Sequence, residues 1–214
     1  MVQGHQKGDA SNMARYTGPK HRLCRAEGVA LCGSAKCPVI TKNAARPGQH
    51  GAKMRRKTSE YGIQLREKQK VKRMYGVLER QFSKYYQIAS AKKEATGEAL
   101  LQILETRLDN TIYRLGLAKS RQQARQLVSH GHVLVDNKRV TIPSYNVKIG
   151  EVISLAPKTA NLAFIKKLLE ENKEETPPPW LSRKITVGKI ESMPKREDLN
   201  AEINERLIVE YYSR

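Results

Sequence analysis

The segment SRQQARQLVSHGHVLVDNKRV, residues 120–140, predicts a helix that is followed at once by a β-hairpin. Ser120 and Gln123 have the spacing of a helix-capping box. Ala124, Leu127 and Val128 recur on one helical face and are expected to point inward. Gly131 stands where a helix-ending glycine is expected. A helix over 121–130 is therefore predicted.

Short strands are predicted on the C-terminal side of this helix, at 132–135, 139–142 and 151–155. Asp136-Asn137 between the first two favours a tight turn with left-handed backbone geometry. A short helix is expected over 109–115. Residues 106–155 are thus predicted to form a compact α+β module.

The flanking segments predict further helices. Apolar stripes of helical period indicate helices at 59–74, at 78–89 and from residue 96 onward, with Ser59 as an N-cap. Residues 161–172 indicate another, with Leu162, Ile165 and Leu169 inward. A stiff connector at 177–179 follows, and residues 184–190 and 206–212 have a β-like composition. Residues 1–12 are small and polar and are expected to be disordered.

The charge of the chain points to a polyanionic partner. The 214 residues contain 40 Lys+Arg and 21 Asp+Glu, a net charge of +19, and the first 100 residues alone carry +14. A basic arm of this kind is typical of nucleic-acid binding. The sequence contains no run of 18 apolar residues, so a membrane span is not expected. It also has no apolar segment near the start of the kind that marks a secretory signal. Three cysteines favour a reducing compartment, the cytoplasm, over a disulfide framework.

Four soft ligands lie within a short stretch of the arm: His21, Cys24, Cys32 and Cys37. Three thiolates and one imidazole suit tetrahedral zinc, and the metal would supply folding energy that this apolar-poor segment lacks. An iron–sulfur cluster is the alternative metal group, and the single histidine favours zinc over it. The alternative to any metal is three reduced thiols in an arm without fixed structure.

Two basic groups in the first half of the chain are candidate RNA contacts. A turn-rich stretch, 47–52, leads into Lys53, Arg55, Arg56 and Lys57. Arg66, Lys70 and Arg73 share one face of the helix predicted at 59–74. Such side chains bind phosphates without reading sequence, and the alternative is a solvated surface.

A third candidate surface is the outward face of the helix at 121–130, with its neighbouring hairpin. It carries Arg121, Gln122, Arg125 and Gln126 on the helix, and His132, Lys138 and Arg139 on the hairpin. Amide and guanidinium groups on one face can straddle an RNA backbone and reach 2′-hydroxyls. We favour this interpretation over an ordinary exposed face.

Several motifs resemble the bacterial small-subunit ribosomal protein family called S-four. They are MARYTGP at 13–19, PGQHG at 47–51, YGIQLREKQK at 61–70, YGVLERQF at 75–82, RLDN at 107–110, residues 120–132, and LIVEYYSR at 207–214. The resemblance covers residues 13–214. It implies an α+β protein with three parts: an arm at 1–58, a helical domain at 59–105 that about 195–214 completes, and an inserted RNA-binding domain at 106–194.

The resemblance also implies a function. The protein would bind small-subunit ribosomal RNA early in assembly and remain in the subunit beside the messenger RNA entry channel, near ribosomal proteins S-three and S-five. It would affect decoding accuracy. Metal-binding members of the family carry cysteines in the arm, and His21 stands here at the first of those positions.

An enzyme is the competing hypothesis, because pseudouridine synthases carry the same RNA-binding module. Arg107-Leu108-Asp109 is similar to their catalytic segment. However, residues 110–114 continue as a predicted helix, and only 59 residues follow Leu155, too few for a large catalytic domain. The sequence therefore favours a non-catalytic RNA-binding protein.

Overall fold

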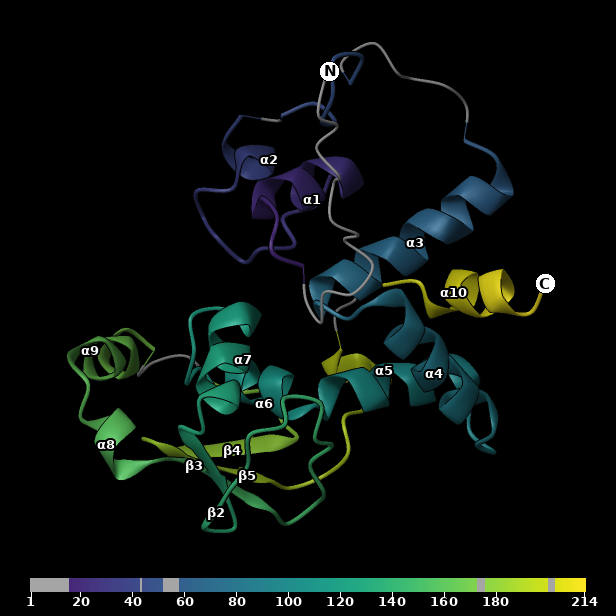
Figure 1. Cartoon of the computed structure of the whole chain (residues 1–214). Coiled ribbons are helices and arrows are strands. Elements are labelled where there is room, and N and C mark those ends of the chain that lie inside the picture. Colours follow the sequence, from purple (N-terminus) through teal and green to yellow (C-terminus); the bar gives the residue numbers. More distant parts are fainter. Residues whose placement is uncertain (1–15, 43, 52–57, 173–175, 200–202) are drawn as a thin grey trace, which may run out of the picture.

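The computed structural model describes residues 16–42, 44–51, 58–172, 176–199 and 203–214 (Figure 1). The expected disorder of residues 1–12 and the basic run of Lys53, Arg55, Arg56 and Lys57 lie outside these ranges. Within them, no helix is both long enough and apolar enough to cross a bilayer.

The first part of the chain is an arm, residues 16–51, with two short helices, α1 (Lys20–Glu27) and α2 (Pro38–Thr41). Helix α1 begins after Pro19 and ends at Gly28, whose φ of 73° is the left-handed geometry that glycine adopts without strain. The arm contributes few side chains to either hydrophobic core, which agrees with its composition.

The helical domain consists of α3 (Glu60–Met74), α4 (Glu79–Ser90), α5 (Thr96–Glu105) and α10 (Glu205–Tyr212). Helix α3 begins at Ser59, whose hydroxyl accepts the Gly62 N–H, as an N-cap should. One core joins the four helices, and its fully buried members include Val71, Phe82, Leu100, Leu101, Leu104 and Ile208. The C-terminal segment thus packs with residues more than 100 positions earlier (Figure 1).

The β-like composition of residues 206–212 predicts a strand. This prediction is wrong, because these residues lie in helix α10. The local composition favours β-structure, but packing outweighs it. Ile208 is fully buried in the helical core, and the Tyr212 ring stacks on Tyr86 with centroids 4.6 Å apart. A helix delivers both side chains to α3, α4 and α5.

The second domain has helices α6 (Leu108–Arg114), α7 (Arg121–Ser129), α8 (Pro157–Ala160) and α9 (Ala163–Glu171). Its strands are β1 (Val133–Val135), β2 (Lys138–Arg139), β3 (Val152–Leu155), β4 (Leu181–Lys184) and β5 (Val187–Ile190). They form one antiparallel sheet in the order β2-β1-β3-β5-β4, with Leu134 opposite Ser154. Helices α6 and α7 cover one face of the sheet (Figure 1). The predicted α+β class is confirmed.

Helix α7 has the ends that its sequence predicts. The Ser120 hydroxyl accepts the Gln123 N–H at the start. At the other end, Gly131 (φ 71°) donates to the Val128 carbonyl and His132 donates to the Leu127 carbonyl, which is a Schellman motif. The turn at Asp136-Asn137 has the expected left-handed geometry, with φ of 47° and 62°.

Two further sequence predictions need correction. The strand expected at 139–142 ends at Arg139. Beyond it the backbone turns toward the start of α6, where the carbonyls of residues 145 and 143 accept hydrogen bonds from the N–H groups of Leu108 and Asp109, which a helix start leaves free. In the helix expected at 161–172, Leu162 is exposed just before α9 begins, and Leu168 is buried instead.

The β-structure expected at 184–190 is confirmed. Lys184 ends β4, residues 187–190 form β5, and Ile185 lies in the turn between them with a φ of 52°.

Candidate metal centre and nucleic-acid interface

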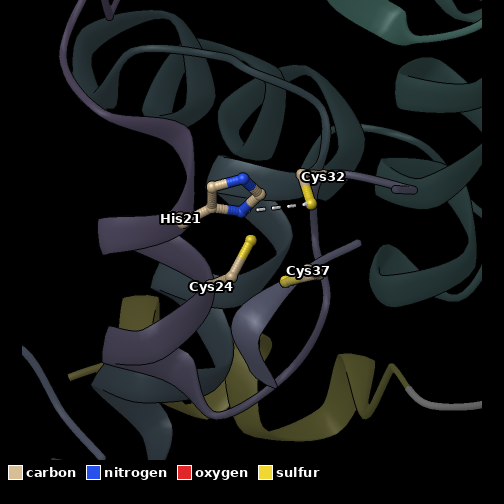
Figure 2. A group of neighbouring side chains, drawn as sticks. All are labelled: His21, Cys24, Cys32 and Cys37. Carbon is tan, nitrogen blue, oxygen red and sulfur yellow. Dashed lines mark hydrogen bonds between the residues drawn. The ribbon is translucent and has the colours of Figure 1, made fainter. Parts of the chain in front are cut away.

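The arm brings together all four expected metal ligands. His21 and Cys24 lie three residues apart on α1, Cys32 lies in the following loop, and Cys37 precedes α2 (Figure 2). Their ligand atoms all lie within 4.8 Å of one another, and the Cys32 Sγ is 3.8 Å from the His21 Nδ1. The three cysteines are free thiols. This donor set can hold a metal ion.

The thiols influence one another's ionisation. Burial, together with the neighbouring Cys32, raises the pKa of the Cys24 thiol to about 12. Burial would also raise the pKa of Cys32, but the backbone of Ser34 and the other two thiols outweigh it and lower that pKa. Since a metal binds thiolates, loading the cluster must release protons.

The arm is attached to α3 by charge and by packing. The Glu27 carboxylate lies 3.6 Å from the Arg66 Nη1 and also receives the Arg73 guanidinium. Leu31, just before Cys32, packs against the helical core. The predicted basic face of α3 is therefore engaged with protein partners: Arg66 and Arg73 contact Glu27, and the Lys70 ammonium lies 2.9 Å from Glu67.

A cleft of about 620 Å³ lies where the arm, α3 and α7 meet. We call it the interdomain groove. Its walls include Lys20 and Leu23 of α1, Gln69, Lys72 and Arg73 of α3, and Gln122, Arg125 and Gln126 of α7. Gln122 and Gln126 are exposed, so their amides are open to a ligand. The groove therefore gathers residues from two of the three surfaces that the sequence singled out.

Two predicted residues of α7 turn their charged ends toward protein. The Arg125 guanidinium contacts the Asp109 carboxylate at 3.1 Å and donates to the Gly76 carbonyl at 2.8 Å. The Arg121 Nε donates to the Asn110 side chain at 2.7 Å. Its guanidinium lies between the rings of Tyr75 and Tyr113, 5.0 and 4.6 Å from their centroids.

A second buried carboxylate, Glu105, lies beside Asn110, the partner of Arg121. Glu105 is fully buried and accepts hydrogen bonds from Tyr75, Asn110 and Arg114 at 2.6–3.0 Å. Burial would raise the pKa of Glu105, but the hydrogen bonds and positive charge of Arg114 outweigh it, so that this pKa lies below its ordinary value. Glu105 is therefore a buried carboxylate held ionised by a charged partner.

The hairpin residues lie at the C-terminal end of α7, away from the capped start that lines the groove. The His132 Nδ1 is 2.8 Å from the Thr159 hydroxyl, and the Arg139 guanidinium donates to the His130 carbonyl. Lys138 is exposed on β2. The structure thus places His132, Lys138 and Arg139 on a separate, flanking surface.

Sequence reasoning missed Lys20 and Lys72 in the groove, and the buried carboxylates of Glu27 and Glu105. For Glu105 a signal exists, since it is a carboxylate at the end of the largely apolar segment LLQIL. A charged residue in such a place is buried only with a partner. For the other three no local signal exists, because their positions depend on how separate segments pack.

Comparisons with known proteins agree with this architecture. The family model described as the ribosomal protein S4/S9 N-terminal domain matches residues 15–105, and the S4 domain model matches residues 106–153. Curated relatives named small ribosomal subunit protein uS4 are similar to this chain over 94% of its length and 100% of theirs. Those of Ruminiclostridium cellulolyticum, Dictyoglomus thermophilum and Thermus thermophilus are 53%, 52% and 49% identical to it.

Proposed function

Because this chain belongs to the uS4 family of small ribosomal subunit proteins, we propose that it binds small-subunit ribosomal RNA as a structural, non-catalytic component of the cytoplasmic ribosome. The observation that carries the proposal is the interdomain groove, which joins exposed amides to lysine and arginine side chains from three segments. Amide and cationic groups bind RNA mainly through phosphates and 2′-hydroxyls.

The proposed RNA surface extends beyond the groove in two directions. On one side it includes the basic face of α3, where Arg66, Lys70 and Arg73 carry positive charge beside the carboxylates of Glu27 and Glu67. The further proposed phosphate contacts Lys53, Arg55, Arg56 and Lys57 lie outside the described residues and rest on their charge in the sequence. On the other side it follows the exposed Gln122 and Gln126 of α7 to His132, Lys138 and Arg139 of the hairpin. Arg121 and Arg125 of the same helix add positive charge there, while their guanidinium groups contact protein. A net charge of +19 supports a large electrostatic share of the binding energy.

We propose zinc as the metal of the His21, Cys24, Cys32 and Cys37 cluster. Tetrahedral zinc holds its ligand atoms roughly 3.5–4 Å apart, and the clustered donors need only small shifts to meet that spacing. A closed set of four protein ligands is typical of a structural site. The metal would hold α1, the Cys32 loop and α2 together, and through Glu27 it would hold the arm on α3.

Four finer roles rest on family resemblance. The protein would join small-subunit RNA early in assembly and contact ribosomal proteins S-three and S-five. It would also line the messenger RNA entry channel and affect decoding accuracy. Separate surfaces for the arm, the groove and the hairpin support simultaneous contact with several partners.

An RNA-modifying activity is not favoured. In a pseudouridine synthase the aspartate must be free to react, whereas Asp109 is buried and bonded to both Arg107 and Arg125. Two guanidinium groups hold its carboxylate in a structural ion-pair network.

The test is footprinting and equilibrium binding on naked small-subunit ribosomal RNA, with and without a chelator. We expect a specific footprint, and an affinity that falls by about 10³-fold or more between roughly 50 and 200 mM salt, as multiple phosphate contacts require. An affinity that stays flat over this range would contradict the proposal. Chelation is expected to erase the part of the footprint due to the arm and to leave the rest.

A further inference from the structure

Arg125 joins the two domains through one guanidinium. Its Nε and Nη2 lie 3.1 Å from Asp109 in the α+β domain, and its Nη1 donates to the Gly76 carbonyl in the turn between α3 and α4 at 2.8 Å. Gly76 has a φ of 64°, which orients that turn. The side chain of Arg125 is 22% exposed. It therefore directs its donors to protein rather than presenting them to solvent.

The acceptor of Arg125 is itself fixed to the helical domain by a second route. Asp109 accepts from the Arg107 Nε and Nη2 at 3.1 and 2.8 Å, and Arg107 donates through its Nη1 to the Tyr85 hydroxyl of α4. The side chains of Asp109, Arg107 and Tyr85 are all buried. Helix α7 is thus tied to α4 through two arginines and one carboxylate.

A parallel connection runs through Glu105. Tyr75 of the helical domain donates to Glu105 at 2.7 Å, Asn110 donates to the same carboxylate, and Arg121 donates to Asn110. Of these contacts, the Asn110–Glu105 bond crosses the domain boundary, because Glu105 ends α5 and Asn110 lies on α6. Charged hydrogen bonds in a partly buried site are among the stronger polar interactions in proteins.

We propose that Arg125 is a positioning residue, which with Asp109 holds α7 against the α3–α4 turn and so sets the geometry of the interdomain groove before RNA arrives. The inference rests on the proposed RNA-binding function. The sequence position of Arg125 suggests a phosphate ligand, and the inference gives this residue a different role. Gln122 and Gln126, on the same helix and exposed, keep their amides for the RNA.

Two substitutions of Arg125 separate the roles. Lysine keeps the positive charge and can neutralise a phosphate, but its single ammonium cannot span Asp109 and Gly76 as the planar guanidinium does. Glutamine removes the charge. If Arg125 positions α7, both Arg125→Lys and Arg125→Gln weaken binding to naked small-subunit ribosomal RNA by a similar factor, about tenfold. The slope of log affinity against log salt stays at its wild-type value in both.

The matched control is Lys138→Gln on the exposed strand β2, which removes a proposed phosphate contact. Its salt slope is expected to fall by about 0.7–0.9, the value for one lost phosphate contact. Wild-type affinity in Arg125→Lys, or a slope reduced in Arg125→Gln as in Lys138→Gln, would overturn the positioning role.

A measurement without RNA keeps the proposal independent of the binding assay. Residual dipolar couplings of the full-length, zinc-loaded chain report the relative orientation of the two domains. We expect one common alignment for wild type and Lys138→Gln, and separate alignments for the two Arg125 variants. A common alignment in all four proteins would overturn the inference. A wild-type chain that fails to bind the RNA would refute the proposed function, while the couplings still test the contact.

Discussion

The Glu27 carboxylate on α1 lies 3.6 Å from the Arg66 guanidinium on α3, with the Glu27 side chain only 2% exposed. This pair, with Arg73 on the same carboxylate, connects the helix that carries His21 and Cys24 to the helical domain. The position of the metal cluster and that of the groove wall are therefore coupled through one buried acid. Substitutions at either end of this connection have distinct expected results.

Glu27→Gln should loosen the arm without removing the metal. The change takes away the acceptor charge of two arginines, which costs about 1–3 kcal/mol for charged hydrogen bonds. Amide hydrogen exchange over residues 20–41 should accelerate by about tenfold or more, since about 1.4 kcal/mol corresponds to a factor of ten. Metal content should stay at one ion per chain, because no ligand changes.

The matched control is Glu170→Gln, which changes a carboxylate on α9, far along the chain from the arm. Exchange in the arm should keep its wild-type rate in this variant. Equal protection of residues 20–41 in wild type and Glu27→Gln would show that Leu31 packing alone attaches the arm.

Cys37→Ser should abolish stoichiometric metal and unfold the arm. Cys37 is fully buried beside the other ligands, and the arm has few apolar contacts to replace the metal. Elemental analysis should find less than one ion per chain. Nuclear magnetic resonance spectra should lose the dispersed signals of 20–41, while those of the helical core at Val71 and Leu104 remain.

His50→Ala is the control for this prediction, since His50 is an exposed arm histidine outside the cluster. It should retain one ion per chain. Full metal loading in Cys37→Ser would remove Cys37 from the ligand set, and loss of metal in His50→Ala would require a different set.

Glu105→Gln should destabilise the protein at neutral pH and lessen its acid sensitivity. The pKa of Glu105 is lower in the folded chain than its ordinary value of 4.5, so the unfolded state binds more protons in acid. The ionised Glu105 therefore stabilises the folded state fully above about pH 4.5, and this stabilisation is lost as the pH falls through the pKa of Glu105 in the folded chain. Breaking the buried pair with Arg114 costs about 3–5 kcal/mol.

Urea unfolding of both proteins from neutral to acidic pH measures this difference. The gap between the two unfolding free energies should be largest at neutral pH and narrow as the solution is acidified. A gap that is independent of pH would mean that Glu105 contributes through packing and neutral hydrogen bonds, not through its charge.

Gly131→Ala should destabilise the α+β domain more than Gly150→Ala. Both glycines have positive φ, 71° and 90°, so each substitution carries about 1–2 kcal/mol of left-handed strain. A Cβ at Gly131 would also lie 2.0 Å from the Arg139 side chain, whereas nothing lies within 4 Å of one at Gly150. Displacing Arg139 breaks its bond to the His130 carbonyl.

The difference between the two variants isolates the Arg139 contact, and chemical unfolding should show an additional cost of about 0.5–1.5 kcal/mol for Gly131→Ala. If the two alanines prove equally destabilising, Arg139 makes no net contribution at this helix end.

Much of the local structure follows from sequence signals that act within a few residues. The cap at Ser120, the glycine end of α7 and the turn at Asp136-Asn137 all occur where the sequence predicts them. The four metal ligands also converge as expected, because a helical spacing and a short loop leave little freedom. Such signals are reliable because the atoms that satisfy them lie close together in the chain.

Contacts between distant segments decided the rest. Residues 206–212 become a helix because Ile208 must enter a core made by α3 and α5, and that core exists only after the chain returns from the α+β domain. The guanidinium of Arg125 faces inward because Gly76, 49 residues earlier, offers it an acceptor. Helical periodicity places a side chain on a face of its helix, but only the tertiary structure determines what that face meets.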